Sequence, residues 1–250
     1  MHPLNRLLAP FSLQLRRVPQ PGAPWKSDQL VILEHFGIDQ IIDVGAHVGH
    51  SAAELFRQGY LGSVISFEPV QKHYDLLAEA VKAGQDQGWR WTARQEALGD
   101  RAGSATIHVA GNGQSSSLAA MLEEHVRLNP DSAYIQDEEV RVVMLDDLAE
   151  ELVTPHKRTL VQLDVQGLER QVLAGAAQTL PKLAAVQLEV SLRPVYQGGL
   201  SVMDAFSLME KANFVPVYVQ PAWMDPISRV FYQLDVLWLR GDLVTTLSDV

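Results

Sequence analysis

Residues 41–51, which read IIDVGAHVGHS, contain an apolar run that ends in an acid and is followed by two glycines four residues apart. A short apolar run bounded in this way is typical of a buried strand in a parallel sheet. The residues behind it, 51–59, have the spacing of a helix that ends at a glycine. Glycine at such a turn permits a tight bend and lets backbone N–H groups approach a ligand closely. The stretch therefore predicts a strand–turn–helix unit with a ligand at the turn.

The same alternation continues along the chain. Strands are expected over residues 40–44, 62–69, 89–100, 104–110, 138–145, 159–165, 183–191, 215–220 and 230–240. Helices are expected over residues 27–37, 51–59, 72–84, 117–128, 146–152, 168–176 and 201–214. Strands that alternate with helices predict an α/β fold with a parallel sheet covered on both faces. The last two strands have no helix between them, so one of them is expected to run antiparallel.

The composition is that of a globular protein that does not bind nucleic acid. The 250 residues are 47% hydrophobic and carry a formal net charge of -10, with no basic patch to attract a nucleic acid or an anionic membrane. The chain has no cysteine, which excludes disulfide frameworks and thiolate metal sites. No stretch approaches the roughly 20 apolar residues that cross a bilayer, and the N-terminus lacks the order of a secretory signal. A cytoplasmic protein without stable membrane insertion is therefore expected.

A proline-rich linker, RVPQPGAPW at residues 17–25, separates the N-terminal segment from the rest of the chain. We therefore expect two parts, with residues 1–26 as N-terminal segment and linker and residues 27–250 as one domain. Residues 3–16 could form a short amphipathic helix that packs on the domain or on a second subunit. A homo-oligomer is thus an open alternative.

The turn and the end of the second strand together point to a nucleoside. Glu68 ends that strand 19 residues after Gly49, and an acid there can accept hydrogen bonds from both hydroxyls of a ribose. A dinucleotide fingerprint would have a glycine where this chain has His47. Asp43 would repel a pyrophosphate and favour a cation such as a sulfonium. The loop therefore predicts a nucleoside cofactor without phosphate and speaks against a nicotinamide-dependent oxidoreductase.

Several motifs occur in an order similar to that of the FkbM family of S-adenosylmethionine-dependent methyltransferases. They are IIDVGAHVGHS (41–51), SFEPV (66–70), EALGD (96–100), SSSL (115–118), VVMLDDL (142–148) and LVQLDVQGLERQVLAGA (160–176). The resemblance covers about residues 28–240. The family usually has asparagine where this chain has His47, so we assign no catalytic role to that histidine.

The resemblance implies a Rossmann-like class I methyltransferase fold for residues 27–250. Such a fold has a mostly parallel seven-stranded sheet, helices on both faces and an antiparallel last strand. The resemblance also implies S-adenosylmethionine as cofactor and O-methylation of a hydroxyl on a sugar, a glycan or a small secondary metabolite. Two alternatives stay open. One is a cofactor-binding or scaffold protein without turnover, and the other is N-methylation, whose Asn/Asp-Pro-Pro-Tyr type of loop is replaced here by LDVQGLE.

Residues at the turn and behind the next two strands are the candidates for cofactor binding. Asp43, Gly45 and Gly49 would surround the methionine part, and Glu68 would accept the ribose. The residues after the third strand would line the adenine. The complete predicted set is Asp43, Gly45, Ala46, His47, Gly49, Glu68, Pro69, Glu96, Ala97 and Leu98.

Two carboxylates are the candidates for the chemistry at the acceptor. Asp164 ends the fourth strand of the sheet and Glu189 lies near the end of the fifth, so the two can converge at strand spacings of about 4.8 Å. An alcohol needs a positioned base or a metal to lower its pKa. Asp164 is the first candidate for that base or for a metal ligand, unless it caps the following helix near Gly167. Magnesium suits paired oxygen ligands, but two carboxylates do not make a cage, so no metal site is predicted.

Ser116, Ser117 and His125 are the candidates for contacts with a small-molecule or glycan acceptor. The serines precede the predicted helix at 117–128, so one of them could instead cap it. His125 could serve as a base, and its alternative role is that of a partly buried histidine in the packing of the domain.

Overall fold

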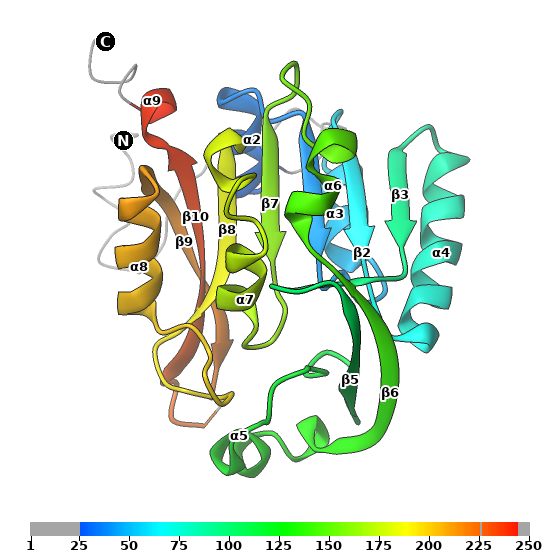
Figure 1. The fold of residues 1–250 in the computed structure, drawn as a ribbon, viewed down its shortest axis with the longest axis vertical. Coiled ribbons are helices and arrows are strands. Elements are labelled where there is room, and N and C mark those ends of the chain that lie inside the picture. Colours follow the sequence, from blue (N-terminus) through cyan, green and yellow to red (C-terminus); the bar gives the residue numbers. More distant parts are fainter. Residues whose placement is uncertain (1–25, 226, 245–250) are drawn as a thin grey trace, which may run out of the picture.

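The computed structural model describes residues 26–225 and 227–244. Seven strands form one sheet in the order β3-β2-β1-β7-β8-β10-β9 (Figure 1). The strands are β1 (Gln40–Val44), β2 (Ser63–Phe67), β3 (Arg90–Arg94), β7 (Thr159–Leu163), β8 (Ala185–Ser191), β9 (Phe214–Met224) and β10 (Phe231–Arg240). Only β10 runs antiparallel to its neighbours in this sheet. The predicted α/β fold class, with its mostly parallel sheet and antiparallel last strand, is confirmed.

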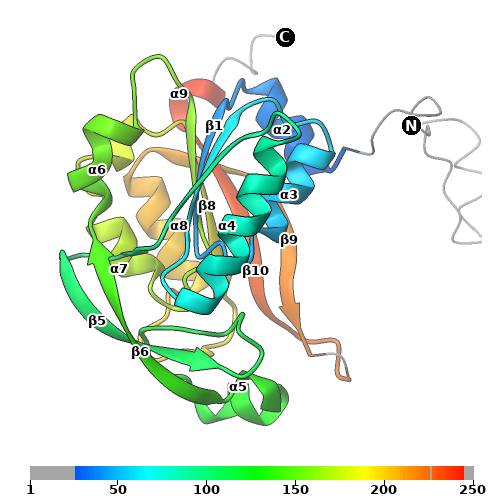
Figure 2. The ribbon, with the colours of Figure 1, turned by 90° about the vertical axis from the view of Figure 1, so that its right-hand side faces the viewer.

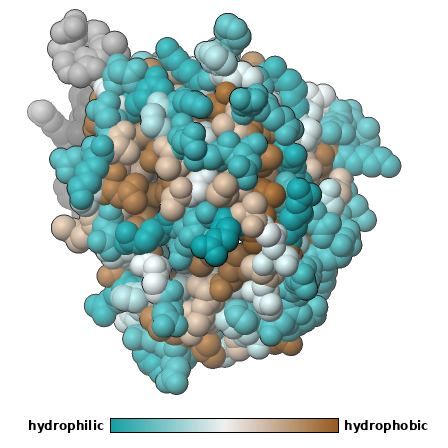
Figure 3. Space-filling view, in the orientation of Figure 1, coloured by the Kyte–Doolittle hydropathy of each residue, from teal (hydrophilic) through white to brown (hydrophobic). Residues whose placement is uncertain are grey.

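Helices cover both faces of the sheet, as the alternating pattern predicted. One layer consists of α2 (Asp28–His35), α3 (His50–Arg57) and α4 (Gln71–Gln85), and the other of α6 (Leu145–Leu152), α7 (Glu169–Ala174) and α8 (Val202–Lys211). Neighbouring residues of β1 enter different cores, because Ile41 packs with the first layer and Ile42 with the second. Every residue of β1 is buried, which explains its continuous apolar run. The face in Figure 3 has hydrophilic residues along its margins and hydrophobic ones between them.

A second, three-stranded sheet has the order β4-β6-β5 and consists of β4 (Ala97–Leu98), β5 (Gly103–Ala110) and β6 (Tyr134–Val143). Together with α5 (Glu123–Leu128) it lies beyond the carboxyl ends of β1, β2 and β7 (Figures 1 and 2). The sequence indicated one strand within 89–100, whereas the structure divides it into β3 and β4. The division follows from β2, which ends at Phe67 opposite Arg94 and continues into Pro69, a residue without an N–H group.

The segment before α5 differs from the predicted helix over 117–128. The helix begins only at Glu123, and the preceding residues form isolated bridges to other strands and loops. Ser117 and His108 of β5 exchange two backbone hydrogen bonds of 2.8 and 3.0 Å, and the Leu122 N–H donates to the Val195 carbonyl at 3.0 Å. Because these N–H groups pair with distant residues, they cannot serve a helix, and residues 111–122 form a loop instead.

The remaining elements are short. They are the 3-10 helices η2 (Pro130–Ser132) and η3 (Leu180–Lys182) and the terminal helix α9 (Gly241–Val244). Ser27 caps α2, because its hydroxyl accepts from the Leu30 N–H at 3.2 Å. The helix predicted within 3–16 and the linker at 17–25 lie outside the described residues. None of the helices in the described part of the chain has the length and apolarity needed to span a membrane.

Candidate functional site

The strand order reverses between β1 and β7, because the chain continues from β1 to β2 on one side and reaches β7 on the other. In open α/β sheets, ligands bind at the carboxyl ends of the strands at such a point. Two cavities, of about 580 and 970 Å³, meet there and share Gly45, His47, Gln114, Asp164 and Gln166 in their walls. We call them the first and the second cavity.

The turn after β1 requires its two glycines. Gly45 has a φ of +86°, and a Cβ atom on it would lie 1.9 Å from the backbone oxygen of Asp164. Gly49 has a φ of +82°, and a Cβ atom there would lie 2.6 Å from the Trp91 ring. The N–H groups of Gly45 and Ala46 both donate to the Phe67 carbonyl at 3.0 Å. The turn therefore brings β1 into close contact with the ends of β2 and β7, which places the first cavity beside bare backbone.

Glu68 is buried at the end of β2, where both of its carboxylate oxygens contact the turn and the start of α4. Oε2 accepts from the His47 N–H and Oε1 from the Val70 N–H, each at 2.9 Å. The His73 Nδ1 lies 3.7 Å from Oε1. A carboxylate oxygen can accept about two hydrogen bonds, so each oxygen of Glu68 retains capacity for a hydroxyl donor.

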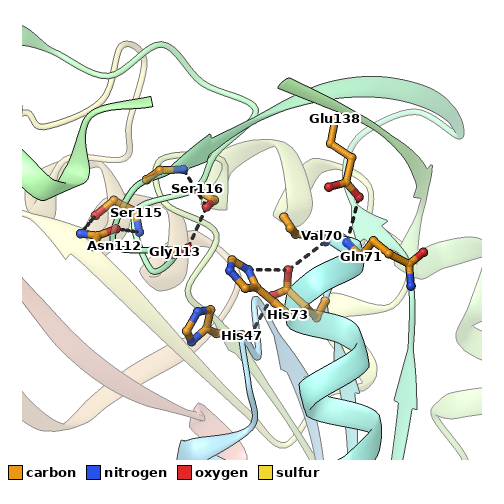
Figure 4. A network of polar contacts seen from close by, with 11 residues as sticks. His47, Val70, Gln71, His73, Asn112, Gly113, Ser115, Ser116 and Glu138 are labelled. Atoms are coloured by element: carbon orange, nitrogen blue, oxygen red, sulfur yellow. Dashed lines mark hydrogen bonds and ion pairs between the residues drawn. The ribbon is translucent and has the colours of Figure 1, made fainter. Parts of the chain in front are cut away.

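Two histidines of this region, His47 and His73, lie next to each other (Figure 4). The His47 and His73 rings meet edge to face with centroids 4.3 Å apart. Burial and the neighbouring His73 lower the pKa of His47, which favours its neutral form. A Cβ atom on Gly113 would lie within 2.9 Å of Nε2 of both rings, so the loop 111–116 closes tightly over them. His47 therefore supports the wall of the site through its backbone N–H and its packing.

The residues predicted to line an adenine ring do line the first cavity. Glu96, Ala97 and Leu98 are joined there by Pro69 and by Ile107 of β5, a residue that the sequence did not single out. Their common wall is mostly apolar. Glu96 is the exception, and its oxygens lie 3.3 and 3.4 Å from nitrogens of Arg94 and Arg141. The second sheet thus completes one side of this cavity.

The two predicted acceptor carboxylates are brought together by a residue that the sequence reasoning missed. The Gln166 side-chain N–H₂ group donates to Asp164 Oδ1 and to Glu189 Oε2, the second at 3.1 Å. Tyr196 donates its hydroxyl to Gln166 Oε1 at 2.7 Å, and Gln233 donates to Glu189 Oε2 at 2.6 Å. Gln166 has a φ of +54°. A Gln-Gly pair directly after a strand was the one signal in the sequence for such a turn.

Burial raises the pKa of both carboxyl groups. The pKa of Asp164 reaches about 6, with the hydrogen bond from Gln166 lowering it and the charges of Asp235 and Glu68 raising it. The pKa of Glu189 lies well above its usual range because burial is reinforced by the charge of Asp164. Asp164 does not cap the next helix, because α7 has no side-chain cap. The alternative prediction, that Asp164 caps the helix near Gly167, is therefore wrong.

The three residues predicted to contact the acceptor are divided between the cavities. Ser116 and Ser117 line the first cavity, and His125 lines the second. Ser117 donates to the Gln166 carbonyl at 2.7 Å and so connects the loop 111–122 with the carboxylate pair. Neither serine caps α5, whose start has no side-chain cap. His125 is only 3% exposed, lies 4.8 Å from the Trp223 ring, and its Nδ1 has no hydrogen-bond partner among the described residues.

Residues 43–216, more than half of the chain, match the family model described as the methyltransferase FkbM domain. The chain belongs to the FkbM methyltransferase family. No curated protein sequence matches this FkbM-family protein significantly.

Many solved structures resemble this FkbM-family protein in fold. One is the magnesium protoporphyrin IX methyltransferase of Synechocystis PCC 6803 with bound SAM, at 12% identity and a TM-score of 0.49 over 85% of this chain and 74% of that one. Another is a putative O-methyltransferase from Klebsiella pneumoniae, at 11% identity and a TM-score of 0.46 over 95% and 88% of the two chains. A third is the 1,6-didemethyltoxoflavin-N1-methyltransferase of Burkholderia thailandensis, at 13% identity and a TM-score of 0.43 over 85% and 76%.

In this FkbM-family protein, Asp43 lies underneath the turn and lines neither cavity. It is buried in β1, where its carboxylate accepts from the Ser66 hydroxyl at 3.1 Å, and Ser66 in turn accepts from the Trp91 indole N–H at 3.0 Å. Burial raises the pKa of Asp43 to about 7, the hydrogen bond from Ser66 lowers it, and the charges of Asp164 and Glu68 raise it. Asp43 therefore lies in the packing beneath the turn, and not in the wall of either cavity as the prediction of a contact with the methionine part required.

The exchange Asp43→Asn is expected to make the stability of the protein less dependent on pH. In the unfolded chain this carboxyl loses its proton near its model value of 3.8, and in the folded chain only near 7. The stability that the Asp43 carboxyl group contributes is complete below pH 3.8 and is lost as the pH rises through about 7. At pH 8 the variant should unfold with a free energy higher by on the order of 2 kcal/mol than the wild type.

Urea unfolding at several values between pH 5 and pH 8 measures this effect. Glu79→Gln on α4 is the matched control, because Glu79 is an exposed carboxylate remote from the site. The same slope of stability against pH in the wild type and in Asp43→Asn would show that Asp43 ionises normally.

No group of three or more histidine, aspartate and glutamate side chains in the described ranges 26–225 and 227–244 is arranged to hold a metal ion. The carboxylates of Asp164 and Glu189 are joined instead by the amide of Gln166. Magnesium therefore has no geometric support as a cofactor here.

Proposed function

We propose that this protein is an S-adenosylmethionine-dependent methyltransferase that methylates a hydroxyl of a sugar, a glycan or another small metabolite. The observation that carries the proposal is the meeting of two sites at one point of the sheet. The turn at Gly45 and the ribose acceptor Glu68 adjoin the pair of carboxyl groups held by Gln166. We expect it to act in the cytoplasm, and residues 27–250 to form its catalytic domain.

The first cavity fits S-adenosylmethionine on the evidence of its own residues. Its wall combines apolar side chains with a few polar groups, which is the usual character of a small-molecule site. Glu68 retains acceptor capacity for the ribose hydroxyls, and Pro69, Ala97 and Leu98 offer an apolar wall to the adenine ring. The turn at Gly45 provides backbone without a Cβ atom. Among the predicted cofactor residues, these are the ones that would hold the nucleoside directly.

When bound, S-adenosylmethionine would supply a methyl group on a sulfonium, and an oxygen nucleophile can bond to this methyl group while S-adenosylhomocysteine leaves as the neutral thioether. The protein's part is to hold the acceptor hydroxyl in line and to accept its proton. With a pKa of about 6, Asp164 is ionised at neutral pH and can accept that proton. Glu189 keeps its proton to a higher pH, so the pair divides into a base and a hydrogen-bond donor. Gln166 fixes the distance between the two.

O-methylation is favoured over N-methylation because a planar amine would need a different loop. After β7 the chain reads LDVQGLE, which turns through Gln166 and presents carboxyl groups to the second cavity. A base of this kind suits an alcohol, whose proton must be removed, better than a neutral amine, which is already nucleophilic. The scaffold alternative would not require the carboxyl pair to be held by three hydrogen bonds from Gln166 and Gln233, with Gln166 itself held by the Tyr196 hydroxyl.

Calorimetric titration with S-adenosylmethionine, S-adenosylhomocysteine and NAD, each with and without magnesium, tests the proposal. We expect the first two to bind in the micromolar range, NAD not to bind, and magnesium to change neither result, because the first cavity has a ribose acceptor but no pyrophosphate cradle. Binding of NAD alone, or of none of the three, would refute the cofactor assignment. Retained binding without transfer to any hydroxylated acceptor would favour the scaffold alternative.

A further inference from the structure

A third cavity, of about 940 Å³, lies on the sheet face next to α2 and α3, beside the second cavity. The two cavities share His50, Ser51 and Asp164 in their walls. A molecule that reaches Asp164 through the second cavity can therefore continue into the third. Each of the two has roughly the volume of a site for one small molecule. Together they form two adjoining spaces that one ligand can occupy.

The third cavity is lined by side-chain amides and carboxylates. Its polar wall includes Gln29, Gln162, Gln187, Gln220 and Asp235. Gln162 and Gln187 are register partners on β7 and β8 and face the cavity side by side. Gln187 is only 6% exposed; its Oε1 accepts from Gln29 at 2.7 Å, and its N–H₂ group has no partner in the described part of the chain. Such amides match ligand hydroxyl groups, which both donate and accept.

Carboxylates face the second and third cavities without a lysine or arginine of the described residues in the cavity walls. Asp164 and Asp235 face this region, and among the described residues their carboxylates accept hydrogen bonds only from the amides of Gln166 and Gln220. Among the described residues that line the second or the third cavity, none is a lysine or an arginine. A phosphate in this region would meet like charge without a partner, whereas an ammonium group would find carboxylates.

The outer wall of the second cavity carries an aromatic face. The Trp223 ring lies 4.8 Å from the His125 ring and 4.9 Å from the Tyr232 ring. His125 contributes a buried Nδ1 that has no partner among the described residues. A flat apolar surface beside unpaired polar atoms suits a sugar ring, which has an apolar face and a polar rim.

Resting on the proposed methyltransferase function, we propose that the acceptor is an amino-sugar oligosaccharide without phosphate groups. Its reacting ring occupies the second cavity beside Trp223 and Asp164. The adjoining ring occupies the third cavity, where its hydroxyls meet Gln162 and Gln187 and its ammonium group faces Asp235. The negative charge of Asp164 and Asp235 excludes nucleotide-activated sugars and phosphorylated acceptors.

Calorimetric titration of the full chain, saturated with S-adenosylhomocysteine and in about 0.15 M salt, tests this proposal. The probes are the β-1,4-linked trimer of glucosamine, its N-acetylated counterpart, which has the same rings without the charge, and UDP-glucose. We expect the glucosamine trimer to bind about tenfold or more tightly than either other probe, in line with one desolvated charge pair. Asp235→Asn should reduce that affinity about tenfold and leave the affinities for the acetylated trimer and S-adenosylhomocysteine unchanged.

Glu79→Gln, which removes an exposed carboxylate on α4, is the matched control for general attraction between a cation and this acidic protein. It should change no affinity. Equal affinities for the two trimers, tightest binding of UDP-glucose, or no binding of either trimer would overturn the proposal. Failure of S-adenosylhomocysteine itself to bind would instead refute the proposed function, so the two failures are distinguishable.

Discussion

Replacing Asp164 by asparagine is expected to lower kcat for methyl transfer by about 10²- to 10⁴-fold, the usual contribution of a positioned general base. The exchange keeps the size of the side chain and removes its ability to take a proton. The affinity for S-adenosylhomocysteine should change little, because the backbone of Asp164, and not its carboxylate, packs against Gly45. Turnover and cofactor binding should therefore respond separately.

The pH profile gives this prediction a second readout. In the wild type, kcat/KM for the acceptor should rise with pH and level off above about 6, where Asp164 is ionised in the free protein. The residual activity of Asp164→Asn should lack this rise. Asp147→Asn is the matched control, because Asp147 is exposed at the start of α6 and makes no side-chain contact with either cavity. Full activity of Asp164→Asn would reduce Asp164 to a structural residue.

Replacing Glu68 by alanine is expected to weaken the binding of S-adenosylmethionine by about 30- to 700-fold. This change corresponds to roughly 2–4 kcal/mol, the loss of one to two hydrogen bonds to a charged group at about 1.5–3 kcal/mol each. Alanine also leaves the N–H groups of His47 and Val70 without their acceptor. The turn at Gly45 should loosen as a result, which adds to the loss of affinity.

Calorimetry on Glu68→Ala and Glu68→Gln separates these two causes. Glutamine can still accept from one of the two backbone N–H groups, so this variant should keep the turn and bind the cofactor with intermediate affinity. Once saturated with cofactor, both variants should turn over within a few-fold of the wild type. Glu79→Ala serves as control for the loss of an exposed glutamate. An unchanged affinity in Glu68→Ala would remove the ribose assignment.

The cofactor side of the site follows largely from local sequence. Gly45 and Gly49 are required by positive φ angles and close approaches within a single turn, and such requirements are visible in the residue types themselves. Glu68 could be placed because the end of β2 follows from its apolar pattern and Pro69. The position of Asp43 was predicted less accurately from the sequence. The pattern locates it in β1, but only the packing of Ser66 and Trp91 shows that it lies beneath the turn.

The acceptor side depends on contacts between residues that are far apart in the chain. Gln166 joins Asp164 to Glu189 only because Tyr196 and Gln233 arrive from other elements. The loop 111–122 is not helical, because its N–H groups pair with β5 and with the loop after β8. The second sheet likewise arises where β3 loses its partner at the end of β2.

The sequence by itself determined the alternating α/β fold, the turn at residues 45–49 and the acid at the end of β2. These features depend on periodicity and on backbone freedom, which are properties of short segments. The tertiary structure alone decided which polar side chains meet at Asp164, how the second sheet closes the first cavity, and that no lysine or arginine of the described residues lines the third cavity. The physical reason is that hydrogen bonding, burial and electrostatic potential depend on distances in space, which residue order leaves open.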